Sequence, residues 1–367
     1  MSRPSRADAS PSSPVHVVVL YGGRSAEHDV SCVTAAHVLR ALDRERYTVT
    51  VIGIDRSGTW HLAESVMNTM HVDIDQLPDS LQAVGLEVSP SLVLKAAQAS
   101  EAPVVVLPLL HGPQGEDGTI QGLLELLDLA YVGSGVLGSA LSMDKSLAKV
   151  VLGAAGIAQP RYHALTEFQI SPRVIEEIVS ELGLPIFVKP ANMGSSIGVS
   201  KARTLAEVHE AVQSALRYDE TVVFEEAISG REIEVAILGN ESPQASVPGE
   251  IVPAHEFYDY EDKYISSGAD LLIPAPLPED ATETVRNLAI KVFATLRGSG
   301  LARVDFFYEE NGRGFLCNEM NTMPGFTPIS MYPKLWLATG ISYSDLINQL
   351  IALALERHQQ RRRNTDR

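Results

Sequence analysis

Charged and amide side chains stand at alternate positions along two neighbouring predicted strands near the end of the chain. The strands are Leu301–Phe307 and Gly314–Asn321, and the Asn311-Gly312 pair between them is a strong hairpin signal. Residues two apart in a strand share one face of the sheet. The polar side chains of both strands therefore gather on one face if the strands pair in a register that brings those faces together.

This face predicts a magnesium site. Arg303 and Asp305 point the same way on the first strand, and Glu319 and Asn321 share a face on the second. Oxygen ligands of this kind suit Mg²⁺, which typically binds through one or two carboxylates and substrate phosphates. The alternative is a solvated polar face on a half-buried sheet. The turn 321–325 (Asn-Thr-Met-Pro-Gly) would place backbone N–H groups nearby and favours the metal site.

A small-residue loop predicts a phosphate contact. Met193–Gly198 follows a predicted strand that ends in Lys189. Small residues let backbone N–H groups approach phosphate oxygens, and a lysine can offset their charge, but such loops are usually only turns. The chain has no Gly-x-x-x-x-Gly-Lys-Ser/Thr sequence, and Gly22-Gly23-Arg24 is not Gly-x-Gly-x-x-Gly. P-loop and dinucleotide-binding folds therefore lose their main support.

Two polar residues follow predicted strands in the first part of the chain. Glu27 lies at a strand-to-helix turn, where the pattern alone favours a helix cap over a ligand for an ammonium group. His111 ends a strand, where α/β proteins place ligand-binding loops, and its pattern leaves a structural and a binding role equally open. A long polar segment, Pro248–Pro278, contains the aromatic and charged run Glu256–Tyr264, which favours a lid that packs over a site.

The elements that must position these residues alternate between strand and helix. Continuous apolar runs predict buried strands, and apolar residues at helical spacing predict helices. In the first part of the chain the predicted strands are Val15–Tyr21, Tyr47–Ile54 and Ala102–Leu110, and the predicted helices are Ala26–Leu42 and Ile120–Leu129. This order is typical of a βαβ-type α/β domain.

Two further blocks lead to the hairpin. The second has helices at Ser142–Gly153, Val174–Leu182 and Leu205–Tyr218, and strands at Pro185–Lys189 and Thr221–Glu226. The third has a strand at Glu232–Leu238 and a helix at Asp280–Arg297 before the hairpin. We expect three domains, at 15–140, 141–228 and 229–357, between a disordered tail at 1–14 and a basic tail at 358–367.

Composition excludes several classes of protein. With 46 acidic and 29 basic residues the net charge is −17, which argues against nucleic-acid binding. The longest apolar runs fall far short of the ~20 residues that a membrane helix needs, and residues 1–14 lack the apolar segment of a signal peptide. Two cysteines provide no disulfide framework and no zinc cluster. We therefore expect a cytoplasmic protein that binds neither membranes nor nucleic acid.

Taken together, these motifs resemble the ATP-grasp D-alanine–D-alanine ligases. The resemblance runs from Val15 to about Glu356, and six segments match in the family's order: 21–28, 111–122, 142–145, 188–198, 257–264 and 318–325. It implies an α/β, three-domain ATP-grasp fold in which the first domain is the βαβ unit and ATP lies between the second and third. It also implies a homodimer, and D-alanine, ATP and Mg²⁺ (two ions, with Mn²⁺ as a substitute) as substrates and cofactor.

The resemblance also assigns roles residue by residue. The residues implied for ATP are Lys145, Lys189, Ser195, Ser196, Glu225, Glu226, Ala227, Ile228, Glu232, Lys263, Asn318 and Glu319. Those implied for catalysis are Glu27, Ser195, Tyr264, Arg303, Gly325 and Ser330, and those for D-alanine are Glu27, His111, Lys263, Ser330 and Met331. The magnesium ligands would be Asp305, Glu319 and Asn321, in agreement with the strand-face argument. For Glu27, the family role as ammonium ligand replaces the capping interpretation.

The implied reaction joins two D-alanines through a D-alanyl phosphate, for peptidoglycan precursors. The nearest alternative is a D-alanine–D-lactate ligase. The pair Lys263-Tyr264 argues against it, because this pair favours dipeptide formation. A catalytically inactive ATP-grasp binding protein is a second alternative, and the intact metal and lysine positions argue against it. An NAD-dependent oxidoreductase lacks its glycine fingerprint.

Overall fold

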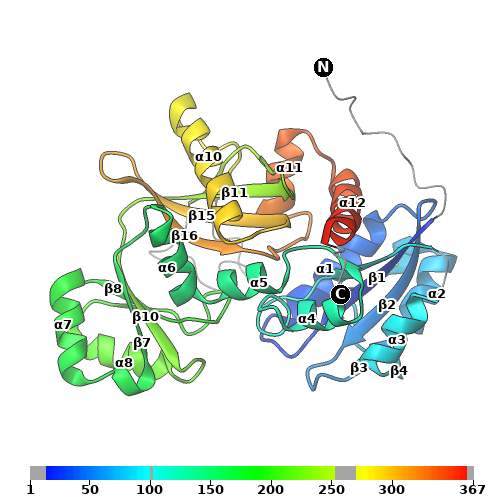
Figure 1. Cartoon of the computed structure of the whole chain (residues 1–367), viewed down its shortest axis with the longest axis horizontal. Helices are drawn as coiled ribbons and strands as arrows, with labels where there is room; N and C mark the ends of the chain where they lie inside the picture. The colour runs from blue at the N-terminus through cyan, green and yellow to red at the C-terminus, as the bar shows by residue number, and fades with distance from the viewer. Residues whose placement is uncertain (1–13, 100–101, 253–269, 362–367) are drawn as a thin grey trace, which may run out of the picture.

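The computed structural model describes residues 14–99, 102–252 and 270–361, and these form three sheets with their covering helices (Figure 1). Of the predicted tail at 1–14, only residue 14 is among the described residues. The predicted lid at 256–264 lies wholly outside them. None of the described helices is long and apolar enough to cross a membrane.

The first sheet has six strands in the order β4-β3-β2-β1-β5-β6. Its centre is parallel: β1 (Val15–Gly22) pairs with β2 (Tyr47–Ile54) and β5 (Val104–Pro108), and β5 pairs with β6 (Ala130–Tyr131). Strands β3 (Trp60–Leu62) and β4 (Leu86–Glu87) extend it in antiparallel fashion. The helices of this part are α1 (His28–Ala41), α2 (Glu64–Val72), α3 (Pro90–Ala97), α4 (Thr119–Leu126) and α5 (Val136–Met143).

The second sheet is antiparallel, in the order β7-β10-β8-β9. Its strands are β7 (Tyr162–Thr166), β8 (Ile186–Pro190), β9 (Ser200–Ala202) and β10 (Thr221–Glu226), and its helices are α7 (Pro172–Leu182) and α8 (Leu205–Ala215). Apolar residues of α7 and α8 join Val188, Val222 and Phe224 in a separate core. The loop between β8 and β9 is therefore carried by a compact unit.

The third sheet follows the order β14-β13-β11-β15-β16, with β12 also paired to β11. Its strands are β11 (Arg231–Gly239), β12 (Gln244–Ala245), β13 (Gly249–Val252), β14 (Asp270–Leu272), β15 (Gly300–Glu309) and β16 (Gly314–Asn321). Helix α10 (Glu279–Thr295) covers one face. The predicted hairpin is confirmed, and β15 runs two residues further than expected.

Three helices connect these parts. Helix α6 (Lys145–Ala154) places Ala148 and Leu152 in one core with α10 and the third sheet. Helices α11 (Met331–Thr339) and α12 (Tyr343–Arg361) lie between the third sheet and the first, and their apolar residues share a core with β1 and α1 (Figure 1). The first and third sheets are therefore joined by a common apolar interior.

Several expected boundaries were wrong. The segment Ser142–Gly153 is not one helix, because Asp144 caps α6 by accepting bonds from Ser146 N and Leu147 N. The polar segment 248–278 contains β13 and β14 at its two ends. The predicted basic tail begins inside α12, where Arg361 forms an ion pair with Glu125 of α4. Helix α2, helix α3 and the short strands β3 and β4 had no sequence signal that we recognised.

Candidate active site

The hairpin register brings the predicted metal ligands together. Asp305 pairs with Glu319 and Arg303 pairs with Asn321, so the four side chains occupy one face. The register shifts directly after this pair, at a β-bulge between Asp305 and Phe306. A bulge re-aims side chains, and both Asn318 and Glu319 line the same pocket. The register therefore brings the two polar faces together as expected, and their role as a metal site stays a prediction.

Arg303 is held by two carboxylates on this face. Its Nε and Nη2 donate to the two oxygens of Asp305, both at 2.7 Å. Glu234, which lies beside Asp305 on β11, places Oε2 3.0 Å from Arg303 Nε. Burial alone would lower the pKa of Arg303, but Asp305 and Glu234 raise it well above its usual value. The half-buried guanidinium of Arg303 is therefore permanently charged.

The donor set fits magnesium. Asp305 and Glu319 supply carboxylate oxygens and Asn321 an amide oxygen, which is the hard-oxygen chemistry that Mg²⁺ prefers. Within the described residues no three His, Cys, Asp or Glu side chains gather closely enough to form a metal site by themselves. Asn321 Oδ1 accepts a bond from Met323 N and does not line the pocket. The site thus fits an ion that completes its shell with phosphate oxygens and water.

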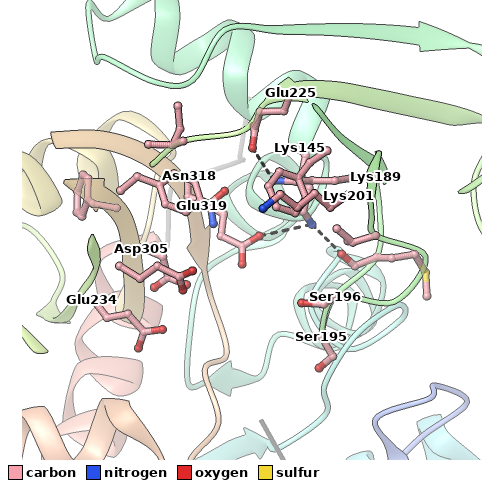
Figure 2. A pocket seen from close by; sticks show the side chains of 18 of the residues that line it. Lys145, Lys189, Ser195, Ser196, Lys201, Glu225, Glu234, Asp305, Asn318 and Glu319 are labelled. Atoms are coloured by element: carbon pink, nitrogen blue, oxygen red, sulfur yellow. Dashed lines mark hydrogen bonds and ion pairs between the residues drawn. The ribbon is translucent and has the colours of Figure 1, made fainter. Parts of the chain in front are cut away.

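Lysines approach this face from the opposite side of the pocket. Lys145 Nζ lies 3.5 Å from Glu319 Oε2 and donates to the backbone oxygen of Met193 at 2.7 Å. Lys189 Nζ donates to Glu225 Oε1 at 2.6 Å. Figure 2 shows Lys145, Lys189 and Lys201 on one side and Asp305 and Glu234 on the other, with Glu319 between them. Cations facing carboxylates across a cleft suit a polyphosphate with its metal.

The pocket collects most of the residues predicted for ATP. Of that set, its lining contains Lys145, Lys189, Ser195, Ser196, Glu225, Glu226, Ile228, Glu232, Asn318 and Glu319. Phe187, Ile233 and Phe306 add apolar surface, and Arg303 and Asp305 form an ion pair in the lining. Ala227 is not part of the lining, and Lys263 lies outside the described residues. The structure therefore brings ten of the twelve residues predicted for ATP into one pocket, and the binding of ATP there stays a prediction.

Glu226 has a second role that the sequence did not indicate. Its carboxylate accepts bonds from Arg161 N and Nε, at 2.8 and 2.9 Å, and from Arg313 Nη1 at 2.6 Å. Arg161 precedes β7, whereas Arg313 lies at the tip of the β15–β16 hairpin. Burial raises the pKa of Glu226, but the bonds from Arg161 and Arg313 lower it by more, so the pKa lies below its ordinary value. The side chain therefore ties the second sheet to the third at the pocket.

Glu27 is not a helix cap. It occupies the N-cap position of α1, but its side chain makes no capping bond. Instead its Oε1 accepts the hydroxyl of Ser195 from the β8–β9 loop, where Ser195 has a left-handed backbone with φ of +50°. A Cβ on Gly112 or on Gly194 would lie 2.7 or 2.9 Å from Glu27 Oε2. Two glycines and a strained serine thus enclose this buried carboxylate.

His111 lies close to Glu27 together with an acid that the sequence did not reveal. Its Nδ1 is 3.1 Å from the backbone oxygen of Met323 and 4.0 Å from Glu116 Oε1. Its Nε2 is buried without a hydrogen-bond partner among the described residues. Burial lowers the pKa of His111 and, together with Glu27, raises that of Glu116 well above its usual range. His111 is therefore a neutral imidazole whose Nε2 can form a hydrogen bond with a ligand.

The remaining predicted residues lie around the turn after β16. A Cβ on Gly325 would be 3.0 Å from Ser330 Oγ, and this hydroxyl is 2.8 Å from Thr327 Oγ1. Met331 is buried at the start of α11. Tyr264, like Lys263, lies outside the described residues, so its role in a hydrogen-bonded set with Ser195 and Glu27 stays a prediction.

Two antiparallel sheets face each other across a cleft of lysines and carboxylates, and an α/β domain precedes them in the chain. This is the arrangement of an ATP-grasp ligase. Two family models match the chain: "D-ala D-ala ligase N-terminus" over residues 16–134 and "D-ala D-ala ligase C-terminus" over residues 151–352. The chain belongs to the D-alanine–D-alanine ligase family.

Individual relatives match over nearly their whole length. The D-alanine–D-alanine ligase of Bacillus pumilus is 47% identical over 94% of this chain and 96% of its own, and that of Shouchella clausii is 48% identical over 94% and 95%. The solved D-alanine–D-alanine ligase of Coxiella burnetii has a TM-score of 0.78 and 37% identity, and covers 95% of each chain. The VanG D-Ala:D-Ser ligase of Enterococcus faecalis has a TM-score of 0.78 and 30% identity, over 93% of this chain and 100% of its own.

Proposed function

We propose that this protein joins two molecules of D-alanine into D-alanyl-D-alanine and converts ATP to ADP and phosphate in doing so. The observation that carries the proposal is the shared pocket in which lysines of α6 and β8 face the carboxylates of the hairpin, one loop away from the enclosed carboxylate of Glu27. A nucleotide and an amino acid would therefore meet at the loop 193–198.

The first step is transfer of the γ-phosphoryl group. A carboxylate oxygen of the first D-alanine attacks the γ-phosphorus, the bond to the β-phosphate oxygen breaks, and D-alanyl phosphate and ADP form. Such transfers depend mainly on positioning and charge neutralisation. Lys145 and Lys189 supply positive charge, and Glu27 holds the ammonium group of the substrate. Magnesium, when bound, would neutralise phosphate oxygens, and Asp305, Glu319 and Asn321 are the residues that would hold it.

The second step forms the amide. The neutral amine of the second D-alanine attacks the acyl carbon. Phosphate then leaves with one oxygen of the former carboxylate and takes up the proton that the amine loses. Negative charge develops on the carbonyl oxygen in between. Arg303 and the backbone N–H of Gly325 are the donors proposed for it, and one such donor is typically worth about 10²–10³ in rate. His111 Nε2 and the hydroxyl of Ser330 are available to hold the second substrate, together with Lys263 and Met331.

Binding of the second substrate separates this activity from the related ones. An amine nucleophile yields a dipeptide, whereas D-lactate would yield an ester through its hydroxyl group. D-Serine would also yield a dipeptide, and the E. faecalis relative is named as a ligase of that kind. Lys263 and Tyr264 favour the amine. We further propose a cytoplasmic homodimer that uses two Mg²⁺ ions, or Mn²⁺ in their place, and supplies peptidoglycan precursors.

The test is phosphate release by the purified protein with Mg²⁺, ATP and one of D-alanine, L-alanine, D-lactate with D-alanine, or D-serine with D-alanine. Products are identified by mass spectrometry. Release that requires D-alanine and yields mainly D-alanyl-D-alanine supports the proposal. Release without dipeptide, or a preference for the ester or for D-serine in equal mixtures, would contradict it.

A further inference from the structure

A buried lysine outside all the motifs above joins the two sheets that form the pocket. Lys149 lies one helical turn beyond Lys145 on α6, is 2% exposed, and places Nζ 2.5 Å from Glu225 Oε2. The other oxygen of Glu225 accepts from Lys189 at 2.6 Å. Glu225 itself is 1% exposed. Lys149, Glu225 and Lys189 therefore form a row of three charges removed from solvent.

The row crosses from one sheet to the other. Helix α6 packs through Ala148 and Leu152 into the core of the third sheet. Glu225, in contrast, is on β10 of the second sheet, and Lys189 is on the adjacent strand β8. The contact of Lys149 with Glu225 consequently fixes α6 against the second sheet. The same helix presents Lys145 to Glu319 on the hairpin, so one rigid element sets both sides of the pocket.

We propose that Lys149 is a positioning residue of the nucleotide site, which acts through Glu225 on Lys189 and holds the two sheets in place around ATP. Because both oxygens of Glu225 are used, its charge is shared between two lysines, and Lys189 keeps capacity for a phosphate group. The proposal rests on the proposed function, since it assumes that the pocket binds a nucleotide.

Lys149 and Lys189 each form an ion pair with one oxygen of Glu225. Tyr162, on β7, has its ring 5.2 Å from Lys149 Nζ. If Lys149 becomes methionine, Glu225 loses one of these two ion pairs and keeps the pair with Lys189. Glu225 and Lys189 then neutralise each other, and less of the positive charge of Lys189 is left to bind the phosphates of the nucleotide.

The experiment measures ADP binding in the presence of Mg²⁺ by titration calorimetry of the full-length protein. Lys149→Met should weaken ADP binding by about tenfold or more, as expected when residues of one charged network are uncoupled. Lys149→Arg should recover most of the affinity. In steady-state assays Lys149→Met should raise the KM for ATP and leave the KM for D-alanine unchanged.

The matched control is Leu152→Ala on the same helix. Leu152 is 1% exposed and belongs to the core of the third sheet, so its truncation destabilises α6 without removing a charge. It should lower the melting temperature and bind ADP like the wild type. Lys149→Gln, which keeps a hydrogen-bond donor for Glu225, carries the same expectation as Lys149→Met if the latter does not fold.

The results separate an error in the proposed function from an error in the role of Lys149. If the wild type binds no ADP, the proposed function is wrong. If the wild type binds ADP and the Met and Gln variants bind it equally well, only the role of Lys149 is wrong. Weakening by Leu152→Ala as large as that by Lys149→Met, without recovery by arginine, would show that α6 matters only through packing.

Discussion

Replacing Glu27 by glutamine separates a substrate role from a structural one. The structure encloses this carboxylate between Gly112, Gly194 and the hydroxyl of Ser195, with only 6% of the residue exposed. Glutamine has the same shape and its amide oxygen can still accept from Ser195. The substitution therefore removes one negative charge and little else.

The expected magnitude follows from that burial. Leaving a buried charge without its partner typically costs about 2–5 kcal/mol. Since each 1.4 kcal/mol is about a factor of ten, a loss of ~2–4 kcal/mol corresponds to a fall in kcat/KM for the first D-alanine of about 30- to 1000-fold. A lost helix cap would instead cost stability, by about 0.5–2 kcal/mol, yet Glu27 makes no capping bond.

The assay combines initial rates of phosphate release at varied D-alanine with thermal unfolding of both proteins. The KM for the first D-alanine should rise, and the melting temperature should change by no more than about 1–2 °C, because 1 kcal/mol shifts a protein of this size by only a few degrees. A melting temperature lowered by several degrees with an unchanged KM would refute the reasoning and restore the capping role.

Three more predictions follow from the site and the sequence. Glu319→Gln removes one carboxylate from the face shared with Asp305, so turnover should fall by orders of magnitude while circular dichroism stays native; near wild-type rates at low Mg²⁺ would exclude the metal assignment. Tyr264→Phe removes a hydroxyl that can donate and accept a hydrogen bond, and should raise the ratio of ester to dipeptide from mixed D-lactate and D-alanine near neutral pH; the same ratio as the wild type between pH 6 and 9 would show that selection lies elsewhere. Burial raises but Lys149 and Lys189 lower the pKa of Glu225, to about 2 from an ordinary value of 4.5, so its contribution to stability is present above pH 4.5 and is lost as the pH falls toward 2. Urea unfolding should therefore depend less steeply on pH in that range for Glu225→Gln than for the wild type, and equal slopes would contradict this coupling.

Features set by local sequence were predictable. The Asn311-Gly312 turn and the alternation of polar residues around it indicated the hairpin, and β15 and β16 pair as expected. Segments rich in apolar and β-branched residues located β1, β2 and β10 to within a residue. In each case the chain specifies the element within a few residues, through turn chemistry or a period of two.

Features set by partners far along the chain were not predictable. Glu234 alternates with apolar residues like any solvated strand position, and only the pairing of β11 with β15 brings it to Arg303. Lys149 lies on a helix where exposed lysines are common, and only the fold brings Glu225 of β10 and the ring of Tyr162 of β7 to it. The two-residue strand β4 and the flanking strands β13 and β14 are too short for periodicity to show.

The central claim is that the carboxylate of D-alanine is activated by phosphorylation before the amide forms. The most direct measurement supplies D-alanine with both carboxylate oxygens labelled as ¹⁸O and determines the label in the released phosphate by mass spectrometry. The account predicts one ¹⁸O in each phosphate and one retained in the new amide carbonyl. Phosphate without label, with its oxygen derived from water, would show that ATP is merely hydrolysed and would contradict the account.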